Sequence, residues 1–395
     1  MQVGIVGKPN VGKSTFFSAL TLAPAQIAAY PFTTIEANKG IGYVRTKCPH
    51  DIIGHPCKPK NAHCENGIRY VPIEILDVAG LVPDAHKGRG LGNKFLDDLR
   101  QADALIHVVD ASGSTDCEGN IIDKGCHDPI EDITFLEKEV SYWIYSIVGK
   151  GFDKIARQAK LAGTKVERLL HDRLTGLMVT EAQIMAGLRN TSMDPDPTHW
   201  TEDDLLRFSQ SLLKVSKPMI IAANKADIAS PELIKKLIDT DNIVIPTAAD
   251  YELTLRRAAK ASMVDYSPGS SVFALKSPEK LNDLQKSALG KISTWLSANK
   301  STGVQDCLEK AVFEMLNLIV VYPVEDETKW TDKEGNVLPD AYLMPRGCTA
   351  KDLAFKVHTD FGNNFIRAID AKTHMTVGAT HVLNDGDVIK IVART

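Results

Sequence analysis

The stretch GKPNVGKS, residues 7–14, decides the fold of this chain. It matches the pattern GxxxxGK[ST], follows the apolar run QVGIV and precedes residues with a helical apolar period. In such a loop the backbone N–H groups curl around phosphate oxygens, Lys13 reaches the β and γ phosphates, and the Ser14 hydroxyl ligates Mg²⁺. The stretch therefore predicts a phosphate-binding loop between a strand and a helix. The residues expected to contact the nucleotide are Gly7, Lys8, Pro9, Asn10, Val11, Gly12, Lys13, Ser14 and Thr15.

Three further apolar runs have the character of strands that are buried on both faces. They are VPIEILDVAG, ALIHVVDAS and PMIIAANKAD, at residues 71–80, 104–112 and 218–227. Each run is nearly all apolar and ends in a polar loop, which is typical of a parallel sheet covered on both sides. We therefore expect a doubly wound α/β domain with a mostly parallel sheet. Its ligand should lie at the carboxyl ends of the strands.

The polar ends of these runs carry two more nucleotide motifs. Asp77 and Gly80 fit DxxG, in which the carboxylate holds Mg²⁺ through water and the glycine N–H bonds the γ phosphate. Asp227 ends an NKxD motif, and its carboxylate can accept hydrogen bonds from guanine N1–H and the N2 amino group, where adenine offers no donors. The two motifs predict GTP and Mg²⁺ as ligands. The residues of the second motif that should contact the nucleotide are Asn224, Lys225 and Asp227.

Two weaker motifs complete the expected site. PTAAD would place Thr247 and the backbone N–H of Ala248 near guanine O6. YPFTT, residues 30–34, lies where the first switch loop belongs, and either Thr33 or Thr34 should complete the Mg²⁺ shell. Spacing does not choose between the two threonines. The expected metal ligands are Ser14, Asp77 and Thr34 or Thr33.

An insertion separates the second and third of these apolar runs by about a hundred residues, far more than one crossover helix requires. Asp128 and Glu131 bracket Pro129 as a capping box, and the apolar residues that follow predict two helices paired as a helical hairpin. A third, short helix should begin at Thr180, with Gln183 as its capping partner.

The end of the chain reads as strand, helix, strand and final strand, which predicts a small α+β domain. We therefore expect one nucleotide-binding domain in two parts, an inserted helical domain and this terminal domain. The expected bounds are 1–127 and 205–316 for the nucleotide-binding domain, 128–204 for the insertion and 317–395 for the terminal domain.

Composition restricts where the chain acts and what it binds. The 395 residues are 44% hydrophobic and 24% charged, which is ordinary for a globular protein. A net charge of −4 excludes a chain that is basic throughout, so a nucleic acid would need a local patch. No signal peptide precedes the first strand, and no apolar run of about 18 residues predicts a membrane span. We expect a cytoplasmic protein, and the sequence leaves its oligomeric state open.

Five of the seven cysteines fall between residues 48 and 126. They are Cys48, Cys57, Cys64, Cys117 and Cys126, and the histidines among them are His50, His55 and His63. These are ligand types that zinc accepts, but the cysteines are farther apart in sequence than in common structural zinc sites. The cysteines are therefore either reduced thiols or part of a metal or disulfide cross-link.

A local basic patch lies in the second helix expected in the insertion. Its basic residues are Lys150, Lys154, Arg157, Lys160, Lys165, Arg168 and Arg173. The helix is either a solvated face or a surface for RNA phosphates. The second reading makes RNA or the ribosome a partner of the chain.

Taken together, GKPNVGKS, YPFTT, DVAGLVPDAHKGRGLGNKFLDDLRQAD and NKAD resemble the Obg-related GTPases, and more narrowly the archaeal and eukaryotic branch of the YchF-type subfamily. The resemblance covers nearly the whole chain, because the ending also resembles a TGS domain, a β-grasp module. It implies a slow GTPase that acts as a ribosome-associated switch. The best-known YchF-type members have lost the lysine and aspartate of NKxD and prefer ATP. Lys225 and Asp227 are intact here, so GTP stays the expected nucleotide, with ATP hydrolysis or RNA binding with little turnover as alternatives.

The resemblance also places Leu81 among GTPases with a hydrophobic residue where many carry a glutamine that orients water. Hydrolysis must then depend on charge and positioning near the phosphates. In GTPases resembling this one, an asparagine at the position of Asn10 helps ligate K⁺, although Asn10 could equally serve only to shape the loop. K⁺ is therefore a candidate cofactor beside GTP and Mg²⁺. The residues expected to act in hydrolysis are Lys13, Thr33, Thr34, Gly80 and Asn10.

Overall fold

The structure is a computed structural model that describes residues 1–22, 38–78, 80 and 91–394. By its internal contacts the chain divides into two compact units. Of the described residues, the first unit takes those up to Gly40 and those from Glu74 to Cys307. The second unit takes residues 41–73 and those from Leu308 onward.

The expected doubly wound sheet is present. Its described strands lie in the order β2, β4, β1, β5, β6, β7, and β3 pairs with β4. Strand β1 is parallel to β4 and β5, and β6 is parallel to β5 and β7. Because the chain leaves β1 toward one side of the sheet and later continues on the other, the carboxyl end of β1 is a topological switch point. The bounds are β1 Gln2–Val6, β2 Lys39–Lys47, β3 His63–Glu65, β4 Ile68–Asp77, β5 Ala104–Asp110, β6 Met219–Asn224 and β7 Ile243–Pro246.

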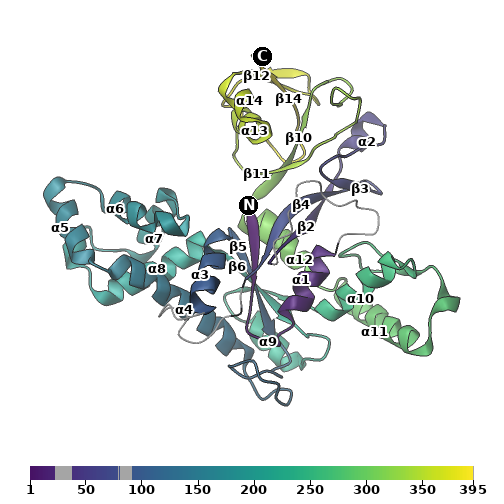
Figure 1. The fold of residues 1–395 in the computed structure, drawn as a ribbon, viewed down its shortest axis with the longest axis horizontal. Coiled ribbons are helices and arrows are strands. Elements are labelled where there is room, and N and C mark those ends of the chain that lie inside the picture. Colours follow the sequence, from purple (N-terminus) through teal and green to yellow (C-terminus); the bar gives the residue numbers. More distant parts are fainter. Residues whose placement is uncertain (23–37, 79, 81–90, 395) are drawn as a thin grey trace. The chain divides into compact units, whose positions relative to one another are not determined.

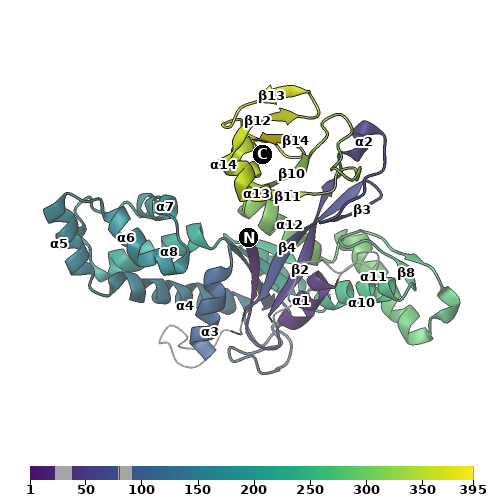
Figure 2. The ribbon, with the colours of Figure 1, turned by 45° about the horizontal axis from the view of Figure 1, so that its top comes forward.

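Helices cover both faces of this sheet. Helix α1 (Lys13–Thr21) follows β1, and α3 (Leu91–Gln101) precedes β5. Figures 1 and 2 show these two helices on opposite sides of β1, β5 and β6. Every residue of β5 is buried, as its apolar sequence predicts for a central strand.

The insertion between β5 and β6 is helical, but it is not a simple hairpin. Gly163 takes a left-handed φ of 60° and ends the second helix, which divides the stretch expected to be one helix into α5 and α6. The capping box at Thr180 and Gln183 is confirmed. Asp128 is the predicted N-cap, but its carboxylate accepts from the Ile130 N–H, and the Glu131 N–H donates to the backbone carbonyl of Asp128, so the predicted capping box was wrong. The helical insertion, as we call it below, comprises α4 Pro129–Gly149, α5 Phe152–Ala162, α6 Val166–Leu174, α7 Glu181–Thr191 and α8 Glu202–Ser216.

The remaining elements of the first unit follow β6. They pack partly on a separate apolar cluster that includes Leu255, Ile292 and Leu296. The bounds are α9 Pro231–Ile238, α10 Ala249–Lys260, β8 Val264–Asp265, β9 Ala274–Leu275, α11 Asp283–Asn299 and α12 Val304–Glu309, the last of which crosses into the second unit. In the part of the chain that the structure describes, no helix is both long and apolar enough to cross a membrane.

The second unit contains the predicted terminal α+β domain. Helix α13 packs on the sheet, and Ile319, Leu353 and Ile389 share one buried core. The described strands run in the order β11, β10, β14, β12, β13, so β11 and β13 add to the strands that the sequence predicts. The bounds are α2 His50–Ile53, β10 Leu318–Val324, β11 Tyr342–Pro345, α13 Ala350–Val357, α14 Thr359–Asn363, β12 Phe365–Asp370, β13 Met375–Val377 and β14 Val388–Ala393.

Candidate nucleotide site

The loop between β1 and α1 is shaped to receive an anion. The first turn of α1 has neither a side-chain cap nor an acidic residue, so its backbone N–H groups and the positive end of its dipole face the loop. Gly12 has a φ of 91°, and a Cβ there would collide with the side-chain amide of Asn224. The Val11 side chain is fully buried and anchors the loop to the sheet.

Residues of the phosphate loop and of the DxxG motif meet here. The Lys13 ammonium forms an ion pair with the Asp77 carboxylate, although the two residues are 64 positions apart in sequence. A Cβ placed on Gly80 would lie 3.9 Å from the carbonyl oxygen of Gly7. The pair provides the cation that a triphosphate needs and the carboxylate that Mg²⁺ needs, each neutralised by the other.

Asn224 connects the phosphate loop to the base-reading loops. Its side-chain nitrogen donates to the Val11 carbonyl at 2.8 Å, and its side-chain oxygen accepts from the Ala249 N–H at 3.1 Å. Asn224 is 3% exposed, so both bonds form away from competing water. The structure therefore brings together the phosphate loop GKPNVGKS, the NKAD motif and the PTAAD stretch.

Lys225 is held by a network that the sequence motifs do not include. Its ammonium donates to Asp110 Oδ2 at 2.8 Å, and the same buried carboxylate accepts from the hydroxyls of Ser112 at 2.6 Å and Ser114 at 2.9 Å. Burial opposes the charge of Asp110, but the bonds from Lys225 and the two serines hold its pKa below the usual value. The sequence signal was present, since Asp110 ends a buried strand and two serines follow it.

Asp227 lies partly buried at the end of the motif. Burial raises its pKa, and the nearby Asp250 carboxylate acts in the same direction, while Lys124 and Tyr251 oppose the rise. A carboxylate in this environment is costly to leave without donors. The two N–H donors that guanine offers would therefore be strongly favoured.

Two groups that the sequence predicts to contact ligands form hydrogen bonds within the protein instead. They are the Ala248 N–H and the side-chain nitrogen of Asn10. The Ala248 N–H, for which the sequence predicts guanine O6 as acceptor, donates to the Thr302 carbonyl at 2.9 Å. The Asn10 side-chain nitrogen donates to the Gly119 carbonyl at 2.9 Å, which leaves the amide oxygen as the atom that could ligate a cation. Asn10 has a φ of 64°, a left-handed conformation in which asparagine is among the more tolerated residues.

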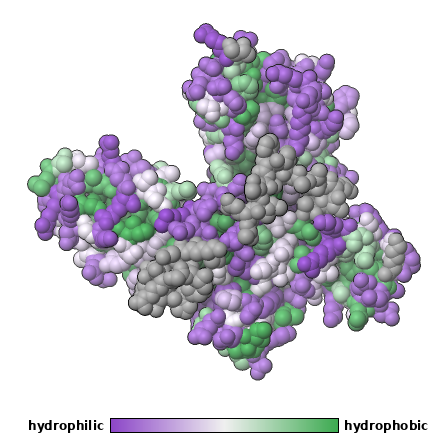
Figure 3. Space-filling model, viewed as in Figure 1, coloured by the Kyte–Doolittle hydropathy of each residue, from purple (hydrophilic) through white to green (hydrophobic). Residues whose placement is uncertain are grey.

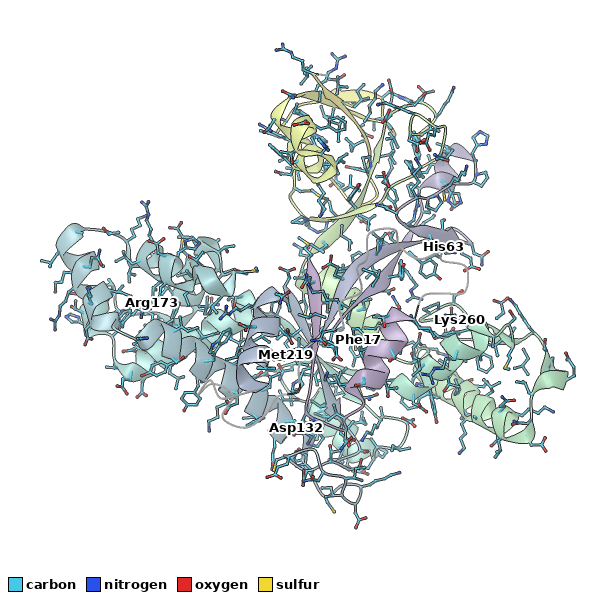
Figure 4. All side chains as sticks on the ribbon, in the orientation of Figure 1. Phe17, His63, Asp132, Arg173, Met219 and Lys260 are labelled. Atoms are coloured by element: carbon cyan, nitrogen blue, oxygen red, sulfur yellow. The ribbon has the colours of Figure 1, made fainter. Side chains whose placement is uncertain are left out.

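The Lys8 side chain is directed into a buried network that sequence reasoning missed. Its ammonium donates to Asp132 Oδ1 at 2.8 Å and to the Thr115 carbonyl at 3.0 Å, and a His127 ring nitrogen lies 2.9 Å from the same Asp132 oxygen. Asp132, labelled in Figure 4, lies in the first turns of α4. Burial and the Lys8 charge lower the pKa of His107 to about 3. Only the backbone of Lys8 is left to meet a phosphate.

The expected contacts of the switch loops lie outside the described residues. Tyr30, Thr33, Thr34 and Leu81 belong to this group. Their roles stay predictions, as do the contacts of the exposed residues Pro9 and Ser14 with a ligand.

Comparison with known proteins agrees with this geometry. Residues 2–139 match the family model of the 50S ribosome-binding GTPase, residues 222–326 match Obg-like GTPase YGR210-like, G4 motif-containing domain, and residues 333–393 match the TGS domain. An uncharacterised GTP-binding protein of Methanocaldococcus jannaschii is 52% identical and covers 99% of both chains. The ribosome-binding ATPase YchF of Bacillus subtilis is 31% identical over 98% of each chain. The chain belongs to the YchF-type Obg-like GTPases.

This YchF-type chain also has a solved structural relative. The crystal structure of a GTP-binding protein from Pyrococcus horikoshii is 44% identical, covers 100% of both chains and gives a TM-score of 0.79. The expected fold, a P-loop GTPase domain with a helical insertion and a C-terminal TGS domain, is thus confirmed. Membership of this family implies nucleotide binding.

Proposed function

We propose that this YchF-type protein is a slow, guanine-specific GTPase that acts as a switch on the translation machinery in the cytoplasm. The observation that carries the proposal is the intact base-reading motif. Lys225 is fixed by Asp110, and Asp227 lies in a partly buried site that favours an N–H donor pair. A site built on such donors rejects an analogue that lacks them by roughly 10⁴ to 10⁵.

Hydrolysis would use few protein groups. Lys13 would leave Asp77 for the β and γ phosphates, and Asp77 would then hold Mg²⁺ with Ser14 and one of the switch threonines. Gly80 would donate its N–H to the γ phosphate. Because Leu81 cannot orient water, turnover should be slow until a partner or a cation supplies further charge.

Turnover of GTP and ATP, each with and without ribosomes, tests the proposal. We expect GTP to be hydrolysed, with ATP turnover near background, and ribosomes to change the GTP rate. The relative named a ribosome-binding ATPase makes the reverse preference the leading alternative. Binding of ribosomes with no turnover of either nucleotide would favour an RNA-binding module.

Potassium should accelerate GTP hydrolysis through Asn10. We expect the rate to be several-fold higher in KCl than in NaCl at equal ionic strength, because a cation between the phosphates supplies part of the stabilisation that an arginine finger gives, roughly 10³ to 10⁵ in rate. Asn10→Gly removes the amide but tolerates the left-handed backbone, so it is a cleaner variant than Asn10→Ala. Both variants should lose the difference between salts. Equal rates of the parent protein in the two salts would contradict the role of potassium.

The basic residues of α5, of α6 and of the turns that precede these two helices are the residues that we propose to bind ribosomal RNA. Six of the seven basic residues are exposed, whereas Arg173 donates to the carbonyls of Ile147 and Lys150 and so caps the end of α4. Figure 4 shows Arg173 within the helical insertion, and Figure 3 shows hydrophilic residues mixed with apolar ones on the side in view. Lys160 is paired with Asp196 at 2.8 Å. Lys150, Lys154, Arg157, Lys165 and Arg168 are exposed and form no ion pair within the described part of the chain.

Replacing Lys154, Arg157 and Lys165 with glutamate should weaken co-sedimentation with ribosomes while GTP affinity stays unchanged. The slope of log affinity against log salt should also become shallower, by roughly 0.7 to 0.9 for each lost phosphate contact.

A matched control replaces Lys286, Lys291 and Lys300, which are exposed lysines on α11 and at its end, and makes the same change in net charge. Co-sedimentation that falls equally in both triple variants would show a general charge effect and would retire the RNA surface.

A further inference from the structure

We propose that Cys48, His50, Cys57 and Cys64 form a structural zinc site in the second unit. One ligand atom from each of the four residues lies within 4.8 Å of the other three. Cys48 follows β2, His50 begins α2, and Cys64 lies on β3, so the short helix turns the chain back to close the cluster. This inference does not depend on the proposed GTPase activity.

Two of the distances between ligand atoms match those of a tetrahedral zinc complex. Bond lengths of about 2.3 Å to sulfur and 2.05 Å to nitrogen put two sulfurs about 3.8 Å apart and a sulfur and a nitrogen about 3.6 Å apart. The Sγ atoms of Cys48 and Cys57 are 3.8 Å apart, and Cys64 Sγ is 3.6 Å from His50 Nδ1. A disulfide would instead require a sulfur separation of about 2.05 Å.

The surroundings of the cluster support a bound metal. His50 Nε2, the ring nitrogen that would not face the metal, lies 3.2 Å from Asp51 Oδ1. A histidine that ligates a metal commonly donates its second N–H to a carboxylate, which fixes the ring and its tautomer.

Arg69 supplies the charge that such a complex needs. Zinc with three thiolates and one imidazole carries one net negative charge. Arg69 is fully buried, and two of its guanidinium nitrogens have no hydrogen-bond partner among the residues that the structure describes. Arg69 lies directly opposite Cys64 in the antiparallel pairing of β3 and β4, which places its side chain beside the cluster. A buried cation beside thiolates is favourable, whereas one beside neutral thiols would lack a counter-charge.

The cluster identifies which sequence candidates are ligands. Cys117 and Cys126 are exposed free thiols, and neither belongs to the cluster. His63 precedes Cys64 on β3 and therefore points to the opposite side of that strand; Figure 4 labels it. The spacing of the cysteines in the sequence did not predict the site, because its ligands come from a helical turn, a loop and a strand.

The site would order the segment that carries its ligands. Within the second unit, Lys58 and Lys60 donate their backbone N–H groups to the carbonyls of Val337 and Pro339 at 2.8 and 2.7 Å. Arg69 donates to the Leu338 carbonyl at 2.6 Å. The zinc-bearing segment is thus bonded to residues 337–339 of the TGS-bearing region. Four protein ligands leave no open position, so the role is structural rather than catalytic.

Metal analysis of the full-length protein tests this inference. We expect about one zinc per chain in protein purified without added metal, and, after its removal, restoration by Zn²⁺ alone. Co²⁺ added to the stripped protein should give the d–d absorption of a tetrahedral site and a thiolate-to-cobalt charge-transfer band. Cys57→Ser and Cys64→Ser should lose most of the metal, whereas the exposed-thiol controls Cys117→Ser and Cys126→Ser should keep it.

Several results would overturn the zinc site. They are a protein that neither contains zinc nor binds Zn²⁺ or Co²⁺ when stripped, a disulfide between Cys48 and Cys57 found by mass spectrometry, and iron in place of zinc. If the cysteine variants do not fold, the metal content and cobalt spectrum of the parent protein still decide. Loss of zinc with unchanged GTP binding would leave the proposed function intact.

Discussion

Asp227→Asn should change the preferred nucleotide from GTP to its xanthosine counterpart. The parent carboxylate accepts two N–H donors from guanine, whereas asparagine offers one acceptor and one donor. Xanthine matches this new pair, because it keeps N1–H and carries an oxygen at C2. We expect the affinity ratio of GTP to XTP to fall by roughly 10⁴, the scale on which a site built for hydrogen bonds rejects a mismatched ligand.

Equilibrium titration of both nucleotides measures this ratio. Asp250→Asn is a suitable control, because Asp250 is an exposed carboxylate close enough to affect the pKa of Asp227. It removes a similar charge but should not change the preferred base. An Asp227→Asn protein that prefers GTP by the parent's margin would show that Asp227 does not read guanine.

Lys8→Met should strongly destabilise the first unit. The substitution removes the lysine ammonium from the Asp132 carboxylate, which keeps its contact with the His127 ring, in a site where the Lys8 and Asp132 side chains are at most 8% exposed. Removing one partner of a buried ion pair typically costs about 3–5 kcal/mol. Urea unfolding followed by tryptophan fluorescence would measure the loss.

Lys138→Met provides the matched control for this prediction. Lys138 is an exposed lysine on α4, the helix that carries Asp132, so the same change there should cost well under 1 kcal/mol. Adding Asp132→Leu to Lys8→Met should recover part of the stability, because no carboxylate is then left unpaired. Similar stability losses in the two lysine variants would contradict the structural importance of the buried pair.

The Lys8 and Asp132 pair also connects the phosphate loop to the helical insertion. Lys8 lies in the phosphate loop, and Asp132 lies in the first turns of α4.

The nucleotide motifs were predictable from sequence because their chemistry restricts both residue type and position. Gly12 needs a positive φ and room beside Asn224, and Lys13 must lie at the start of α1. The buried strands were equally predictable from sequence, since β5 and β6 are apolar along almost their whole length.

Features that depend on distant partners were not predictable. The bonds from Lys225 to Asp110 and from Lys8 to Asp132 join residues more than a hundred positions apart, so no sequence spacing assigns the two partners to each other. The break between α5 and α6 was missed because apolar spacing continued across Gly163, whose left-handed conformation ends the helix.

The most direct test of guanine specificity is equilibrium titration of the full-length protein with GTP and with ATP, in Mg²⁺ and at one ionic strength. The account predicts that GTP binds tighter by roughly 10⁴ or more, because only guanine presents donors to Asp227. ATP binding as tight as GTP binding, or tighter, would contradict it.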